Sequence, residues 1–240
     1  MLEYLSVACI FMVAGFAQGV TGFGSALVAM PLLLLFLDAK VAVPLCILNG
    51  LLITAYLSWQ LRRHMDWRKI LPLGLGCLPG IYVGVSFLRA ADSDLIKLAL
   101  GGLLTAYGLH GLLFRPVKRR VHPAWGYVAG FGTGAIGAAF SAGGPPAIIY
   151  TTMSGWSKDS IKATLSGFFL ANGICIALAH AVNGLTTMVV FHYFAAAALA
   201  VLAGVWAGSR FYGRISTEAY IRVILFLLVC MGGMMIVTTL

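Results

Sequence analysis

The sequence predicts an all-α polytopic membrane protein built from two inverted-topology repeats. Of the 240 residues, 61% are hydrophobic and only 10% are charged, whereas an ordinary soluble domain carries about 25% charged residues. Stretches without any charged residue are as long as the ~20 residues that a helix needs to cross a bilayer, or longer. Glycine patterns of the first half also return in the second. We therefore expect a single membrane domain, with repeat 1 over 1–114 and repeat 2 over 121–240.

The charge-free stretches set the order of the elements. They cover 4–37, 41–61, 70–88, 98–114, 121–157, 163–209 and 223–240. Glu3 stands where a secretory leader would carry basic residues, so we expect the first stretch to remain in the protein. The five cysteines are scattered within apolar stretches and indicate neither a disulfide framework nor a metal site.

The first stretch, 4–37, has an awkward length and a breakable sequence. Its 34 residues would form a helix of about 51 Å, too long for one crossing of a ~30 Å core and too short for two. The segment QGVTGFGSALVAMP (18–31) lies near its middle and is rich in glycine. Non-helical backbone at membrane depth must be buried in protein or line a cavity. We therefore predict a re-entrant hairpin of two half-helices here and in 121–157.

Internal similarity supports the pairing of the two stretches. A shift of 115 residues places 15–31 on 130–146 and matches Gly15, Phe16, Gly19, Gly22 and Pro31 with Gly130, Phe131, Gly134, Gly137 and Pro146. Farther along, a shift of 124 places GIYVGVSF (80–87) on GVWAGSRF (204–211), and helix-start signals follow in both copies at 92–94 and 216–218. Each repeat is thus predicted to hold one hairpin and three full spans.

The basic residues favour hairpins over simple crossings. With eight simple spans, the 16 lysines and arginines divide evenly between the two sides. With two hairpins and six spans, at about 41–61, 70–89, 96–114, 160–181, 187–208 and 219–238, thirteen lie inside and only Lys40, Arg89 and Lys97 lie outside. The lysines and arginines therefore indicate membrane topology rather than nucleic-acid binding. Because each half has three spans, the second half is predicted to be inverted relative to the first, with both termini in the periplasm. The tips of the two hairpins would then enter from opposite faces and meet near the midplane of the membrane, as in secondary transporters.

The polar residues predict an anion as cargo. Every carboxylate lies at the end of a stretch or in a loop, so we expect no metal ion, cation site or cofactor in the interior. No lysine or arginine lies mid-span, so backbone N–H groups at half-helix N-termini would have to hold an anion, where glycine allows close approach. The predicted substrate-binding residues are Gln18, Thr21, Gly22, Gly24, Ser25, Asn49, Thr133, Ser141, Gly143, Gly144 and Asn172.

Several of these features have a purely structural alternative. The GxxxG spacings Gly15/Gly19 and Gly130/Gly134 also suit close helix packing, the favoured interpretation for Gly80/Gly84 and Gly204/Gly208. Asn49 and Asn172 fall in the middle of equivalent spans, where an amide either bonds a neighbouring helix or faces a cavity. For His110, His180 and His192 we expect interfacial or hydrogen-bonded histidines rather than proton carriers.

The glycine-rich N-terminal segment that ends in proline, and its return as GTGAIGAAFSAGGPPAIIY, resemble the TauE/SafE family of sulfite and organosulfonate exporters. The resemblance covers nearly the whole chain. It implies multi-pass insertion in the bacterial inner membrane and export of small sulfur-containing anions such as sulfite or sulfoacetate. The lipid bilayer and a small anion are the partners it implies, and a homo-oligomer stays open.

Two other classes of function compete with an exporter. A passive anion channel could use the same two half-sites, and saturating flux at low turnover would distinguish the carrier from it. A membrane-embedded hydrolase would need a base beside the serine of FSAGG, and no His/Asp constellation accompanies it in the interior. We therefore expect a transporter and not an enzyme.

Overall fold

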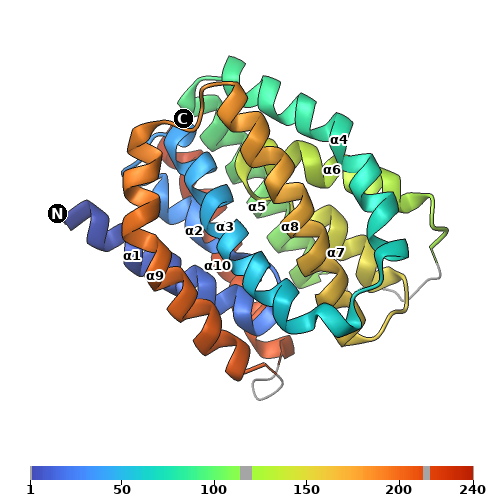
Figure 1. Cartoon of the computed structure of the whole chain (residues 1–240). Helices are drawn as coiled ribbons and strands as arrows, with labels where there is room; N and C mark the ends of the chain where they lie inside the picture. The colour runs from blue at the N-terminus through green and yellow to red at the C-terminus, as the bar shows by residue number, and fades with distance from the viewer. Residues whose placement is uncertain (1, 114–120, 213–216, 240) are drawn as a thin grey trace.

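The computed structural model describes residues 2–113, 121–212 and 217–239, and throughout these ranges the regular elements are helices. The basic cluster at 115–120 and Arg214 lie outside the described residues. The helices, drawn in Figure 1, are α1 (Leu2–Thr21), α2 (Ser25–Leu33), α3 (Ala39–Leu61), the 3₁₀ turn η1 (Arg62–His64), α4 (Trp67–Ala90), α5 (Ser93–Leu113), α6 (Trp125–Phe140), α7 (Gly144–Met153), α8 (Lys158–Val182), α9 (Met188–Arg210) and α10 (Thr217–Thr239).

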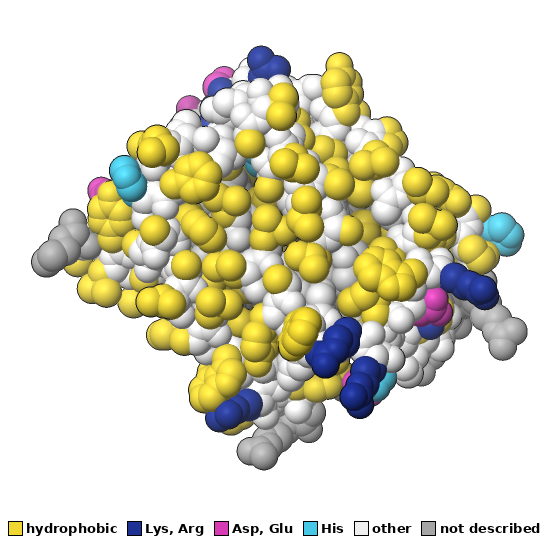
Figure 2. Space-filling model, viewed as in Figure 1, with side chains coloured by type: hydrophobic (Ala, Val, Ile, Leu, Met, Phe, Trp, Pro, Cys, Tyr) yellow, Lys and Arg dark blue, Asp and Glu magenta, His cyan; other side chains and the backbone are white. Residues whose placement is uncertain are grey.

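Six helical segments among the described residues are long and apolar enough to cross a membrane. They are Leu2–Thr21, Ala39–His64, Trp67–Ala90, Ser93–Leu113, Asp159–Val182 and Met188–Arg210. Five of them coincide with predicted spans. The sixth predicted span, 219–238, falls in α10, where a shorter apolar segment, Leu225–Thr239, qualifies instead. Figure 2 shows hydrophobic side chains over the middle of one face and charged side chains toward its edges, so the chain is a multi-pass membrane protein.

Both long stretches are broken near the middle, as the sequence predicts. The segment 22–24 separates α1 from α2, and 141–143 separates α6 from α7. Each short link joins two helices that contact each other. The legs are unequal, because α1 has 20 residues and α2 only 9. A first leg of that length exceeds the predicted half-helix.

Glycines let the helices of the two sequence halves approach closely. Gly204 and Gly208 of α9 lie against the backbone carbonyls of Met12 and Phe16 in α1, and Gly80 of α4 lies against Phe131 O in α6. A methyl group at any of these glycines would overlap the facing carbonyl. The packing interpretation of Gly80/Gly84 and Gly204/Gly208 is therefore confirmed.

The glycines of the two broken stretches pack in the same way. Gly15 and Gly19 of α1 lie against Val201 O and Val205 O of α9, while Gly130 and Gly134 of α6 lie against Leu73 O and Cys77 O of α4. These four glycines therefore serve helix packing, the structural alternative raised by their GxxxG spacing.

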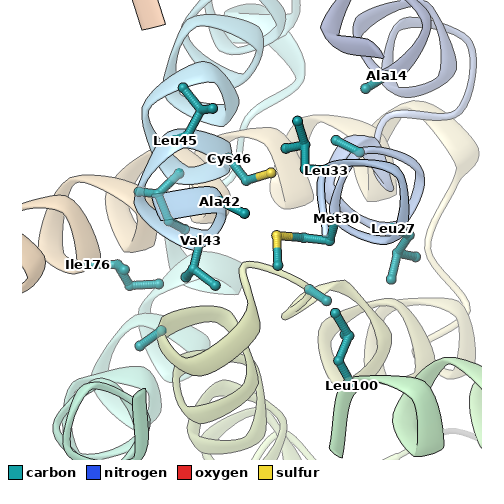
Figure 3. Packing of buried hydrophobic residues seen from close by; sticks show 14 of the residues in the cluster. Ala14, Leu27, Met30, Leu33, Ala42, Val43, Leu45, Cys46, Leu100 and Ile176 are labelled. Carbon is teal, nitrogen blue, oxygen red and sulfur yellow. The ribbon is translucent and has the colours of Figure 1, made fainter. Parts of the chain in front are cut away.

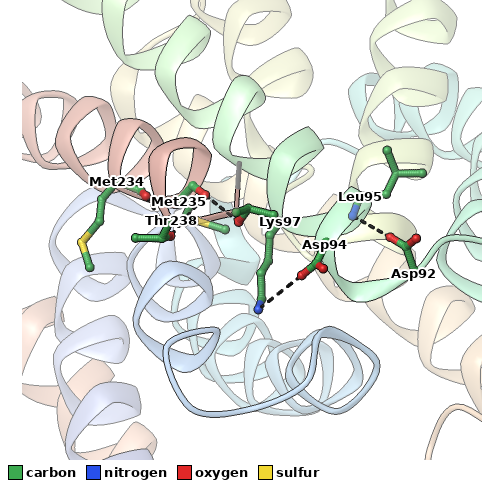
Figure 4. Close-up of polar contacts among 8 residues, drawn as sticks. Asp92, Asp94, Leu95, Lys97, Met234, Met235 and Thr238 are labelled. Atoms are coloured by element: carbon green, nitrogen blue, oxygen red, sulfur yellow. Dashed lines mark hydrogen bonds and ion pairs between the residues drawn. The ribbon is translucent and has the colours of Figure 1, made fainter.

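The remaining helices form the centre and one flank. α3 and α8 pack against each other, as do α5 and α10. Figure 3 shows α2 seated in the core, with Leu27, Met30 and Leu33 among side chains of neighbouring helices; Met30 and Leu33 are fully buried. Figure 4 shows the start of α5 beside α10, where Asp92 Oδ1 accepts from Leu95 N at 2.7 Å and Asp94 pairs with Lys97 at 3.9 Å.

Contacts between loops place the ends of the helices on two opposite edges. On one edge, Lys69 Nζ donates to Ser160 Oγ at 2.8 Å, so the segment after α3 lies beside the start of α8. On the other, Lys40 Nζ donates to Arg89 O at 3.3 Å and Arg89 donates to Asn183 Oδ1 at 2.8 Å. The two predicted re-entrant hairpins would bring these helix ends together as the hydrogen bonds require. The orientation in the membrane and the inverted repeat stay predictions.

We predict that close glycine packing between α4 and α6 is required for stability. Gly80→Ala should lower the free energy of unfolding by about 1–3 kcal/mol, because the new methyl group overlaps Phe131 O. Gly74→Ala in the same helix is the matched control, since no atom lies within 4 Å of its added carbon. Thermal unfolding of both variants in detergent measures the difference. Equal midpoints would show that α4 and α6 are not packed this closely.

Candidate functional site

A cavity of about 90 Å³ lies between the two helix breaks. Its wall comprises the first turn of α2, the link from α6 into α7, and the facing sides of α3, α6 and α8. A water molecule needs roughly 10–15 Å³ of such volume, so the cavity has room for several waters or one small solute. No charged or histidine side chain is among the residues described as lining it.

The cavity brings together most of the predicted binding residues. Eight of the eleven line it: Gln18, Gly24, Ser25, Thr133, Ser141, Gly143, Gly144 and Asn172. They come from five helices and from both halves of the sequence. Thr21, Gly22 and Asn49 are absent from the wall. The structure thus assembles one site from residues up to 154 positions apart in the chain, Gln18 and Asn172 being the extremes.

The first tip, where the link 22–24 leads into the first turn of α2, has the free N–H groups of a helix N-terminus. Gly24 takes a left-handed conformation with φ of 94° and caps α2 without a side-chain bond. The Oε1 atom of Gln18 accepts a 3.3 Å hydrogen bond from Ser25 N and so ties the end of α1 to the start of α2. Ala26 and Leu27 follow in the first turn, where N–H groups have no partner inside the helix. This positive dipole end faces the cavity.

The second tip differs from the first in its donors. Ser141 has φ of 57°, a left-handed conformation that is uncommon outside glycine and recurs at functional sites. Gly144 begins α7, but the next two residues, Pro145 and Pro146, have no N–H. The first turn of α7 therefore presents fewer backbone donors than that of α2. The two prolines therefore make the two tips unequal as anion sites.

Two side chains in the wall have polar atoms without a partner. Asn172 is 5% exposed and Thr133 is 1% exposed. Neither Asn172 Oδ1 nor Thr133 Oγ1 makes a hydrogen bond within the described part of the chain. A buried polar group without a partner costs about 1–3 kcal/mol, so these atoms mark the wall as a place where a bound solute or water would be stabilised.

The three predicted residues outside the wall have local roles. The Thr21 hydroxyl donates to Ala17 O at 2.8 Å and to Phe23 O at 2.6 Å, so it shapes the link after α1. Gly22 has φ of 88° and packs against the stem of Lys162. Asn49 is fully buried, and its Nδ2 donates to Leu45 O within its own helix at 3.0 Å. Of the two mid-span asparagines, only Asn172 lines the cavity.

The sequence reasoning missed a buried lysine beside the first tip. We had assigned Lys162 to a basic cytoplasmic loop, but it lies in α8 and is 4% exposed. Its Nζ donates to Gly19 O near the C-terminus of α1 at 2.9 Å. Helical spacing was the available signal, because positions 162, 165, 166, 169 and 172 share one face of α8 and are buried or half-buried.

A tyrosine and an aspartate complete the surroundings of Lys162. Its Nζ lies 3.6 Å from the ring centroid of Tyr212, and the Tyr212 hydroxyl donates to Asp159 Oδ1 at 3.1 Å. Burial, together with the bond to Asp159, raises the pKa of the Tyr212 hydroxyl to about 12. The hydroxyl therefore stays protonated at neutral pH and keeps Asp159 engaged.

The opposite end of α8 makes a corresponding contact with the second broken stretch. His180 is fully buried, and its Nε2 lies 3.0 Å from Ala138 O of α6. Ala138 is the third residue from the end of α6, as Gly19 is from the end of α1. The hydrogen-bonded role that we expected for His180 is confirmed. α8 thus contacts both broken stretches, and Asn172 lies between its two contacts.

Comparisons with known proteins agree with the geometry. The family model described as "Sulfite exporter TauE/SafE" matches residues 7–235. A protein of Cupriavidus necator named "Probable sulfite/organosulfonate exporter TauE" is 26% identical over 240 residues, covering 97% of this chain and 93% of that protein. No solved structure matches the chain.

We predict that two adjacent glycines at the second tip respond differently to substitution. A methyl group at Gly143 would overlap Thr133 O and the backbone of Gly137, whereas at Gly144 it would meet only Ile148 Cδ1 at 3.2 Å. Gly143→Ala should therefore lower the free energy of unfolding by about 1–3 kcal/mol, and Gly144→Ala by less than about 1 kcal/mol. Thermal unfolding in detergent checks this, and equal losses would contradict the arrangement of the tip.

Proposed function

The chain belongs to the TauE/SafE family of sulfite exporters, and we propose that it is a secondary carrier of small sulfur-containing anions such as sulfite or sulfoacetate. The anion would occupy the cavity between the two helix breaks and leave the cell across the bacterial inner membrane. The relative of 26% identity carries the name of a sulfite/organosulfonate exporter, which supports this class of cargo.

The start of α2 at the cavity is the observation that carries the proposal. A helix N-terminus is a ready-made anion site, because its N–H groups are unpaired and its dipole end is positive. Ala26 and Leu27 provide this end at the wall, while Ser25 N already donates to Gln18 Oε1. The absence of carboxylates from the described lining removes the main source of repulsion. The same lining gives the Ser141 hydroxyl no histidine or carboxylate as a base, so hydrolysis is not supported there.

The loop contacts support the proposed topology of two inverted repeats with re-entrant hairpins. Lys69 and Ser160 would lie on opposite sides of the membrane if the chain crossed it in eight simple spans, and so would Arg89 and Asn183. Their hydrogen bonds agree with the hairpin arrangement instead. In that arrangement both termini face the periplasm, and the hairpin tips approach from opposite faces, as in carriers that work by alternating access.

A binding screen tests the proposed function directly. The purified protein is titrated with sulfite, sulfate, thiosulfate, sulfoacetate, taurine and simple carboxylates, and saturable flux of each binder is then measured in proteoliposomes. We expect at least one sulfur oxyanion to bind and to be transported at low turnover. If only carboxylates bind, the substrate is not a sulfur-containing anion. Unitary currents would show that the protein is a channel and not a carrier.

We predict that the two mid-span asparagines have different effects on anion binding. Asn172→Leu should weaken binding by about 1.5–3 kcal/mol, the value of a hydrogen bond to a charged group, because Asn172 lines the cavity. Asn49→Leu should leave affinity unchanged and cost about 0.5–1.5 kcal/mol of stability, the net value of its bond to Leu45 O. Calorimetric titration with thermal unfolding measures both. An equal loss of affinity in the two variants would place Asn49 at the site as well.

We predict that His64 and Ser157 lie on the cytoplasmic side and Ala90 on the periplasmic side. Single cysteines at these positions, in a background without the five native cysteines, should react with an impermeant reagent added from outside only at Ala90→Cys. All three positions are exposed. Labelling of Ser157→Cys but not of His64→Cys from the periplasm would contradict the hairpin topology and support the topology with eight simple spans.

A further inference from the structure

Lys162 places the charge of a lysine close behind the anion-binding tip. Its stem covers Gly22, where an added Cβ would lie 2.7 Å from Lys162 Cγ. Gly22 precedes the cavity-lining Gly24 by two residues, a reach of at most about 7 Å. The Nζ atom therefore lies on the order of 10 Å from an anion at the start of α2, although Lys162 is not part of the wall.

The groups around Lys162 do not neutralise it with an ion pair. Its hydrogen-bond acceptor is a backbone carbonyl, Gly19 O, and its other close partner is the neutral ring of Tyr212. Asp159 is the carboxylate nearby on the same helix, and the Tyr212 hydroxyl donates to it. Among the described residues, no carboxylate oxygen lies within 4.0 Å of Lys162 Nζ. Gly19 of α1 and Gly22 of the link that follows it, neither of which carries a charge, both contact Lys162.

We propose that Lys162 is a proton-binding site linked to the anion site, so that the carrier binds an anion and a proton together. The inference rests on the proposed function. A nearby negative charge favours the ammonium form of a lysine, and linkage is reciprocal, so the protonated lysine strengthens anion binding by the same factor. On anion binding, the neutral Nζ amine takes one proton from solvent, and it returns that proton on release.

The size and direction of the effect follow from the distance. Two unit charges on the order of 10 Å apart in an effective dielectric of about 20 change each other's binding by about tenfold. The anion therefore binds most tightly at a pH where Lys162 is protonated. Its affinity falls by about tenfold as the pH rises and Nζ loses its proton. A proton taken up with the anion also reduces by one unit the negative charge that enters the low-dielectric interior.

Calorimetry with sulfoacetate, whose own charge is constant from neutral to mildly alkaline pH, tests the linkage. Titrations at one pH in buffers of different ionisation enthalpy give the number of protons taken up per anion. The wild-type protein should take up a fraction of a proton, up to one. Lys162→Arg keeps the charge and should bind with similar affinity but without proton uptake. Lys162→Met should bind about tenfold more weakly, also without uptake.

Two matched variants distinguish this site from other protonation sites. Lys69→Met removes a half-exposed lysine on the same edge and should leave affinity and proton uptake unchanged. His180→Gln removes another buried titratable group that contacts a broken stretch and should leave proton uptake unchanged. Uptake that persists in Lys162→Arg, or that disappears in His180→Gln, would overturn the assignment to Lys162.

The outcomes also separate this inference from the proposed function. Anion binding by the wild-type protein without any proton uptake would overturn the linkage and leave the carrier proposal intact. Absence of sulfoacetate and sulfite binding would overturn both, because the linkage requires an occupied anion site. If Lys162→Met fails to fold, the arginine variant alone decides the question through its loss of proton uptake.

Discussion

The structure depends on the cost of interrupting a helix inside a membrane. Backbone N–H and C=O groups freed by a break find no partner in lipid, so a broken segment must be enclosed by protein. Here both breaks turn toward the interior. The carbonyls near the ends of α1 and α6 receive Lys162 Nζ and His180 Nε2 from α8, and the start of α2 faces the cavity. Some of the freed groups bond to α8, others bond to Gln18 and Thr21 within the first break, and the rest are available to a solute.

Much of this arrangement could be predicted from the sequence, because its signals are local. Charge-free length gave five of the six predicted spans, glycine clusters located both breaks, and eight of eleven candidate residues line one cavity. Polar side chains near a helix break find few other hydrogen-bond partners in an apolar chain, which is why they lie together at the cavity.

The errors arose where side-chain direction decides the outcome. Asn49 and Asn172 look equivalent in the sequence, but only Asn172 points to the wall, since rotation about a helix axis is set by packing. Lys162 was counted as a surface charge because lysines near helix ends normally reach water. Here Gly22 leaves space for its stem and Gly19 supplies an acceptor, so the side chain turns inward.

The glycine contacts between α1 and α9 and between α4 and α6 also determine which parts of the molecule can move as units. Each broken stretch is fastened by backbone-to-backbone contact to a helix from the other half of the sequence. A rigid body that carries one hairpin must therefore contain segments from both halves. The rigid parts of the molecule therefore differ from the halves of the sequence.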